Sequence, residues 1–227
     1  MARDWDLRAG ELAAEALAEG RPTEWFDRLY AEGAAGRISM PWNRDEPQTD
    51  LRAWAERAGL GPGAGGRAAG RALVVGCGLG ADAEYLSRLG FAVTAFDVAP
   101  TAVAEAHRRH PGSAVDYRQA DLLDLPPAWS RAFDLVVEVY TVQALPDPPR
   151  DKAMDAVADL VAPGGRLVVV AFRRTADDDP AAGPPFPLTR EMLGRFVQRG
   201  LTEVTLEERD GPRWLAEYRR SRLAGGG

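Results

Sequence analysis

The sequence predicts an α/β fold built on a doubly wound, mostly parallel sheet. Short apolar runs bounded by turn residues recur after residue 71, and segments with the 3.6-residue period of a helix separate them. The apolar runs are continuous, as in strands that helices cover on both faces. Strands that alternate with helices imply right-handed crossovers, and hence parallel pairing.

Length and composition allow one domain of this class with additions. The chain has 227 residues, of which 45% are hydrophobic and 27% charged. No apolar run approaches the ~20 residues of a membrane helix, and the first residues lack the apolar stretch of a secretory signal. We therefore expect a cytoplasmic protein without a membrane partner. The net charge of -6 argues against a nucleic-acid partner, and one cysteine with two histidines argues against a structural metal.

The first 60 residues predict a helical cap or lid. Residues 8–19 are rich in Ala and Glu, apolar side chains recur between Trp25 and Tyr30, and a further helical pattern begins at Asp50. Residues 33–47 have the composition of a loop, and residues 61–70 that of a glycine-rich linker. The expected organisation is a cap over residues 1–60, a core over residues 61–222 and a disordered tail over residues 223–227.

The elements of the core follow in order along the chain. Strands are expected at residues 72–75, 92–96, 133–137 and 167–171 and just before Gln119, with helices at 81–89, 100–110 and 149–161. Two strand-like runs at 202–208 and 213–218, joined by Asp210-Gly211-Pro212, predict an antiparallel hairpin at one edge. The sheet therefore has seven strands.

A glycine-rich turn connects the first strand to the first core helix. The run Gly76-Cys77-Gly78-Leu79-Gly80 allows a sharp turn and close approach to a ligand, and the following helix offers free N–H groups. Asp97 ends the second strand, followed by Val98, where a carboxylate can accept hydrogen bonds from both hydroxyls of a ribose. With Ala81 the run also satisfies a relaxed dinucleotide fingerprint, so an NAD-dependent oxidoreductase is an alternative.

The later strands favour a different nucleotide. Asp121 follows the third strand, where it can accept from an adenine amino group while the backbone N–H of Leu122 donates to the ring. Glu138 lies in the fourth strand, and Pro163-Gly164-Gly165 precedes the fifth. This succession resembles the class I S-adenosylmethionine (SAM) methyltransferases over residues 71–172. The resemblance implies a Rossmann-like fold and SAM as cofactor, bound by Gly76, Gly78, Gly80, Asp97, Val98, Asp121 and Leu122.

Four ordered segments narrow the resemblance to the thiopurine methyltransferase and plant halide/thiol methyltransferase group. They are Trp25-Phe26 through Leu29-Tyr30 with Pro41-Trp42, Gly76-Cys77-Gly78 with Asp82-Ala83, Tyr140-Thr141 with Ala144-Leu145-Pro146, and Gly183-Pro184-Pro185-Phe186. The resemblance implies that Trp25 and Trp42 pack on SAM, that Glu138 contacts it, and that Tyr140 acts in catalysis. Trp25 and Trp42 could instead be core anchors of the cap. Because Val74 replaces the usual acid before the first glycine, the methionine end of SAM needs another partner.

Methyl transfer mainly requires alignment of the acceptor with the methyl group and exclusion of water, so a strong base is optional. His107 and His110 fall on a helix that covers a sheet face, away from the expected crevice, which leaves Glu138, Tyr140 and acids of the cap as candidate bases. We therefore expect a small-molecule acceptor that is already nucleophilic near neutral pH, first a thiol or thione. N- or O-methylation of a small metabolite and non-catalytic SAM binding are alternatives. The fourth strand lacks the Asn/Asp-Pro-Pro-aromatic run that nucleic-acid methyltransferases use to grip a flipped base.

Overall fold

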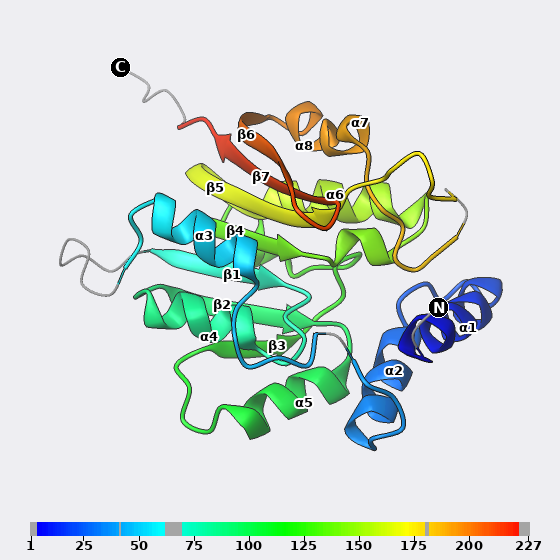
Figure 1. Cartoon of the computed structure of the whole chain (residues 1–227). Coiled ribbons are helices and arrows are strands. Elements are labelled where there is room, and N and C mark those ends of the chain that lie inside the picture. Colours follow the sequence, from blue (N-terminus) through cyan, green and yellow to red (C-terminus); the bar gives the residue numbers. More distant parts are fainter. Residues whose placement is uncertain (1–3, 41, 62–69, 180–181, 223–227) are drawn as a thin grey trace.

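The computed structural model describes residues 4–40, 42–61, 70–179 and 182–222, which form a three-layer α/β sandwich (Figure 1). Seven strands of these residues make one sheet in the order β3-β2-β1-β4-β5-β7-β6. Neighbouring strands are parallel except for β5 with β7 and β7 with β6, which pair antiparallel. The predicted doubly wound sheet with a C-terminal hairpin is confirmed.

The strand and helix bounds follow the chain order. The strands are β1 (Arg71–Val75), β2 (Ala92–Asp97), β3 (Asp116–Gln119), β4 (Phe133–Val139), β5 (Val161–Phe172), β6 (Leu201–Arg209) and β7 (Arg213–Arg220). The helices are α1 (Asp4–Ala18), α2 (Trp25–Ala34), α3 (Thr49–Arg57), α4 (Ala81–Arg88), α5 (Pro100–Arg109), α6 (Pro149–Leu160), α7 (Arg190–Leu193) and α8 (Arg195–Gln198). Two 3-10 turns, η1 (Pro127–Trp129) and η2 (Val142–Ala144), complete the described elements.

Strand β5 begins six residues before its predicted start. The glycine turn that we expected to precede the strand lies within it, because the pairing of β5 with β4 shifts register between Phe133 and Leu135. Such an irregularity accommodates extra residues in one strand without ending the ladder. Helices α5 and α6 begin at Pro100 and Pro149, where the missing N–H has no intrahelical partner to lose.

Helices cover both faces of the sheet. Along β1, Leu73 and Val75 face the layer of α6, α7 and α8, whereas Ala72 and Val74 face the layer of α3 and α4. Trp54 of α3 is buried in this second layer. We expected the segment of α3 to belong to the cap, and its packing on the sheet moves the proposed boundary between cap and core to before Thr49.

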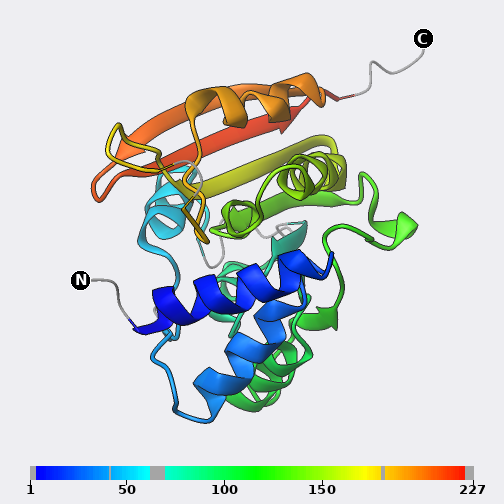
Figure 2. The ribbon, with the colours of Figure 1, turned by 90° about the vertical axis from the view of Figure 1, so that its right-hand side faces the viewer.

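Helices α1 and α2 form the rest of the cap. They pack together around Leu12, Trp25 and Leu29 and lie at the carboxyl ends of the parallel strands (Figures 1 and 2). The carboxylate of Asp27 accepts a hydrogen bond from the Thr101 N–H at the start of α5, with 2.8 Å between Oδ1 and N. This bond attaches the cap to the core.

Two sequence-based expectations concern residues outside the described ranges. They are the predicted disordered tail and all but the ends of the glycine-rich linker. Within the part of the chain that the structure describes, none of the helices combines the length and the apolar character that crossing a membrane requires.

Candidate functional site

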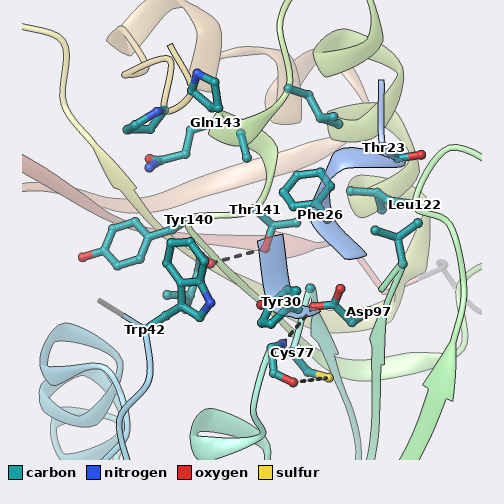
Figure 3. Close-up of a pocket in the computed structure, with 18 of the residues that line it drawn as sticks. Thr23, Phe26, Tyr30, Trp42, Cys77, Asp97, Leu122, Tyr140, Thr141 and Gln143 are labelled. Carbon is teal, nitrogen blue, oxygen red and sulfur yellow. Dashed lines mark hydrogen bonds between the residues drawn. The ribbon is translucent and has the colours of Figure 1, made fainter. Parts of the chain in front are cut away.

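A cavity of about 290 Å³ opens where the carboxyl ends of β1, β2 and β4 meet the cap. The strand order reverses direction between β1 and β4, which is where open α/β sheets bind ligands. Figure 3 shows side chains from both the cap and the core converging on this space. Of the predicted site residues, the lining includes Trp25, Trp42, Gly76, Gly78, Asp97, Val98, Asp121, Leu122 and Tyr140.

The glycine-rich turn after β1 forms one wall. Gly76 and Gly78 have φ angles of 58° and 52°, which other residues rarely adopt, and a side chain at Gly76 would collide with Thr141. The Cys77 N–H donates to the Phe96 carbonyl oxygen at 2.8 Å and so fixes the turn against β2. Gly80, which we expected to bind the cofactor, does not line the cavity. It is the N-cap residue that precedes α4, and a side chain there would meet the Tyr117 hydroxyl.

Asp97 presents a fixed carboxylate at the end of β2. Its Oδ2 accepts from the Gly78 N–H at 2.9 Å and its Oδ1 from the Ala99 N–H at 3.0 Å. Burial raises the pKa of Asp97 from 3.8 to about 6, although these N–H groups favour the charged form. Each carboxylate oxygen can accept a second hydrogen bond, so the group is suited to the paired hydroxyls of a ribose.

Asp121 links the cavity to the cap. Its Oδ1 accepts from the Leu123 N–H at 2.8 Å, and its Oδ2 accepts from the Thr23 hydroxyl at 3.2 Å. Thr23 precedes α2 and also lines the cavity. A carboxylate in this position can exchange the Thr23 hydroxyl for another donor, such as an exocyclic amino group.

The tryptophans of the cap have two roles. Trp25 is 4% exposed and belongs to the apolar core of the cap, and its ring stacks on Phe26 with centroids 3.9 Å apart. The Trp42 ring makes an edge contact with Tyr30, with centroids 6.1 Å apart. Both indoles line the cavity as well as anchoring the cap, and their packing against SAM stays a prediction.

The chain turns sharply after β4. Tyr140 has a φ of 60°, which is uncommon for a residue with a side chain, and its N–H donates to the Val170 carbonyl oxygen at 2.9 Å. The Tyr140 ring stacks on Phe172 with centroids 4.9 Å apart. Its hydroxyl accepts a hydrogen bond from Gln48 Nε2 at 3.1 Å. The ring and the hydroxyl of Tyr140 are therefore held in place at the cavity wall.

Glu138 does not take the position that we expected. Its side chain is fully buried and absent from the cavity lining, and its Oε1 accepts from the N–H groups of Thr141 and Val142 at 2.6 and 3.0 Å. Burial raises its pKa to about 7. The next two residues along the chain, Val139 and Tyr140, line the cavity instead. Glu138 therefore stabilises the turn that presents Tyr140, and the expectation that it binds SAM directly is corrected.

Sequence reasoning missed several polar residues of the lining, among them Tyr30, Arg44 and Gln143. Arg44 Nη2 donates to Asp82 Oδ2 at 2.9 Å, and the Tyr30 hydroxyl lies beside Gly78. Their spacing from Trp25 and Trp42 could have indicated the first two. Gln143 carried no sequence signal, because its position depends on the turn after β4.

The two histidines lie outside the cavity, as the sequence predicted. His107 is exposed, but His110 Nε2 lies 3.2 Å from the Leu79 carbonyl oxygen, at the back of the glycine turn. Neither side chain lines the cavity.

The lining matches the chemistry of SAM. The Asp97 carboxylate matches the ribose and the Asp121 carboxylate an adenine amino group, while Arg44 and Tyr30 lie near the glycine turn. These are two donors and two acceptors suited to a nucleoside that carries an amino acid. The residues present therefore fit this group.

Comparisons with known proteins agree. Residues 72–165 match a family model described as a methyltransferase domain. The chain is 35% identical over 183 residues to a ubiquinone biosynthesis O-methyltransferase from Xanthomonas axonopodis pv. citri (strain 306), covering 77% of this chain and 72% of that protein.

Solved structures extend the comparison. The N-methyltransferase NodS from Bradyrhizobium japonicum WM9, in complex with S-adenosylhomocysteine, is 25% identical with a TM-score of 0.58, covering 79% of this chain and 91% of that one. A protein described for the conversion of a disulfide bond into a thioacetal group during echinomycin biosynthesis shares the fold, with a TM-score of 0.70 and 24% identity over 89% of this chain and 93% of that one.

These matches support a broad class and do not support the narrower thiopurine and halide/thiol group. They also decide between the two nucleotides that the glycine turn left open, in favour of SAM. The chain therefore belongs to the class I SAM-dependent methyltransferases.

Proposed function

We propose that this methyltransferase acts on a small, planar, aromatic acceptor whose reacting atom ionises without a base from the protein. The observation that carries the proposal is the division of the cavity into two chemically different parts. One part has the glycine turn and three carboxylates, one of them paired with Arg44, and the other has aromatic rings, proline rings and one carboxamide.

The polar part would hold SAM. Asp97 would accept from the ribose hydroxyls, Asp121 and Leu122 would meet the adenine, and Arg44 with Tyr30 would receive the methionine end. When bound, SAM supplies the electrophilic methyl group. The protein's part is to fix these side chains before binding, which it does through backbone N–H groups at Asp97 and through Asp82 at Arg44.

The apolar part would hold the acceptor. Its walls come from the cap, from the turn after β4 and from the segment after β5, and they include Trp5, Phe26, Tyr140, Leu145, Phe172, Pro184 and Pro185. Flat rings stack well on such walls, and the low polarity excludes water from the reacting atoms. Tyr140 is the proposed catalytic residue, because its fixed ring borders this part of the cavity.

The described lining favours acceptors that ionise by themselves. Asp82 is paired with Arg44, Asp97 is held by two N–H groups and would face the ribose, and Asp121 accepts from Thr23 and Leu123. None of these carboxylates is available as a base. A thiol or thione, with a pKa about 8.5 or lower, is the first candidate. An acidic phenol is the second, since the relative reported above carries the name of an O-methyltransferase.

We also propose that the cap acts as a lid. Two of its hydrogen bonds to the core, from Thr23 to Asp121 and from Thr101 to Asp27, lie beside the expected nucleotide position. The cap would therefore close on a loaded core and exclude water from it. Cytoplasmic localisation remains a prediction.

A methyl-transfer screen tests the proposed acceptor class. Purified protein with SAM labelled in the methyl group is incubated with thiophenol, 2-mercaptopyridine, 4-nitrophenol and aniline. We expect labelled product from the thiols and the acidic phenol, with rates that rise with pH to each acceptor's own pKa and then level off. Tyr140→Phe should lower the rate without moving that profile. SAM binding without transfer to any thiol or phenol would refute the proposed acceptor class.

A further inference from the structure

We infer that Gln143 selects the acceptor by donating a hydrogen bond from its side-chain amide to an uncharged acceptor group next to the methylated atom. This inference rests on the proposed function, because it concerns the acceptor part of the same cavity. It names a residue that the sequence did not indicate and a chemical feature that the substrate must carry.

The carboxamide of Gln143 has a fixed orientation. Its Oε1 accepts from the Phe172 N–H at 2.6 Å, and its own carbonyl oxygen accepts from the Phe186 N–H at 2.7 Å. The residue is 1% exposed. Because a backbone N–H can pair only with the amide oxygen, the NH₂ group must be the other end of the side chain.

The orientation of the carboxamide directs its NH₂ group to the cavity. Gln143 is part of the lining, and the side-chain hydrogen bond that the described residues make with Gln143 uses its Oε1, which leaves Nε2 for a ligand. In Figure 3, Gln143 and Tyr140 lie on the side of the cavity away from Asp97 and Cys77. This is the apolar part, where an amide donor without a partner favours a ligand that supplies an acceptor.

The charges around this donor narrow the chemistry. Arg44 is the guanidinium of the described lining, and it is paired with Asp82 beside the glycine turn. A carboxylate, sulfate or phosphate on the acceptor would therefore meet only a neutral amide in apolar surroundings, which would not offset its desolvation. A ring nitrogen or a carbonyl oxygen would be matched by one neutral donor. The expected substrate is therefore an aromatic thiol or phenol with such a group beside the reacting atom.

A double cycle of enzyme variants and acceptors tests this inference. The acceptors are thiophenol and 2-mercaptopyridine, which differ by one ring nitrogen beside the sulfur. Gln143→Glu keeps an oxygen for the Phe172 N–H but replaces the cavity-facing donor by an acceptor. We expect it to lower kcat/KM for 2-mercaptopyridine about tenfold more than for thiophenol, as the loss of one hydrogen bond predicts. Differences in acceptor pKa cancel, because each variant is compared with the wild type on the same acceptor.

Two further variants secure the result. Gln143→Met removes the donor without adding charge. It should also lower the ratio of kcat/KM for 2-mercaptopyridine to kcat/KM for thiophenol. Gln198→Glu makes the matched charge change on the exposed end of α8 and should leave this ratio of kcat/KM values unchanged. SAM affinity, measured by calorimetry, should stay within about twofold of the wild type in all three.

The outcomes separate the inference from the proposed function. If wild-type protein methylates both acceptors and Gln143→Glu or Gln143→Met slows them equally, the role of Gln143 is refuted and the proposed function stands. If wild-type protein binds SAM but methylates neither these probes nor the acidic phenol, the proposed acceptor class fails, and the inference that depends on it fails with it.

Discussion

The carboxyl group of Asp97 should couple SAM binding to pH. Burial raises its pKa from 3.8 to about 6 in the unliganded protein. Hydroxyl donors of a ribose would favour the charged form, so the pKa should fall on binding to its ordinary value or below. This difference between the two pKa values corresponds to about 3 kcal/mol. The protein with a charged Asp97 should therefore bind SAM roughly a hundredfold more tightly than the protein with a neutral Asp97.

The sign of the effect follows from the protonation states. Above pH 7 the carboxyl is charged before and after binding, so the affinity should not change with pH through Asp97. Below pH 6 the free protein carries a proton that binding must release. The dissociation constant should therefore rise up to about tenfold per pH unit, and about tenfold in total between pH 8 and pH 5.

Isothermal titration calorimetry gives both quantities. Titrations at pH 8 and pH 5, each in two buffers with different ionisation enthalpies, yield the dissociation constant and the number of protons released. We expect close to one proton per SAM bound at pH 5 and near zero at pH 8 from this group. The same titrations on the Asp97→Asn variant measure the contribution of the ligand's own ionisable groups, which is then subtracted from the wild-type values. The variant should bind SAM more weakly, and its affinity should depend little on pH. Wild-type and Asp97→Asn proteins with parallel pH profiles would refute the assignment of Asp97 to the ribose.

Three further predictions concern the turn after β4, the glycine turn and the cap. The folded-state pKa of Glu138, about 7, lies above its ordinary 4.5, so its neutral form stabilises the fold below pH 4.5 and this contribution is lost as the pH rises through 7. In denaturant titrations, the free energy of unfolding of Glu138→Gln should therefore rise by about 3 kcal/mol relative to that of the wild type between pH 4.5 and 8. A difference that stays constant with pH would contradict the burial argument. Gly76→Ala should lower the melting temperature and abolish SAM binding, because its side chain would collide with Thr141, while Gly112→Ala, with a φ of 79° but open space around it, should cost only the backbone strain of about 1–2 kcal/mol and leave SAM binding intact. Asp27→Ala should speed hydrogen exchange in α2 several-fold and weaken SAM binding about fivefold, because it loses a hydrogen bond of about 1 kcal/mol. Asp27→Asn keeps an acceptor for the N–H at the start of α5 and should behave like the wild type, so equal exchange rates in the two variants would argue against the lid.

The sequence predicted the fold closely because local patterns determine it. Continuous apolar runs give buried parallel strands, and glycine or proline residues mark their ends. The start of β5 was wrong for a physical reason, since the glycines at 164 and 165 bend the strand without ending it. Helix α3 was assigned to the cap because its apolar face has no sequence signal that distinguishes a sheet partner from a helix partner.

The site was predictable where it follows a strand end. The glycine turn, Asp97 and Asp121 each sit directly after a parallel strand, so their convergence depends only on the sheet. Glu138 was misplaced because its carboxylate binds the N–H groups of Thr141 and Val142. The sharp turn that brings these groups to it, with the positive φ of Tyr140, is not revealed by the sequence. Arg44 reaches the cavity from a loop and Gln143 from the short 3-10 turn η2, where no periodicity fixes a direction.

The hydrogen bond from Gln48 to Tyr140 bears on the order in which the two substrates bind. Gln48 Nε2 donates to the Tyr140 hydroxyl, and the Gln48 backbone N–H donates to Asp82 Oδ1 at 2.7 Å. Asp82 also accepts from Arg44, the residue that we expect to receive the methionine end of SAM. Gln48 and Asp82 therefore connect the expected SAM part of the cavity with the wall of the acceptor part. Binding of SAM at Arg44 should order the acceptor wall as well, so the acceptor should bind more tightly to the SAM-loaded protein than to the free one.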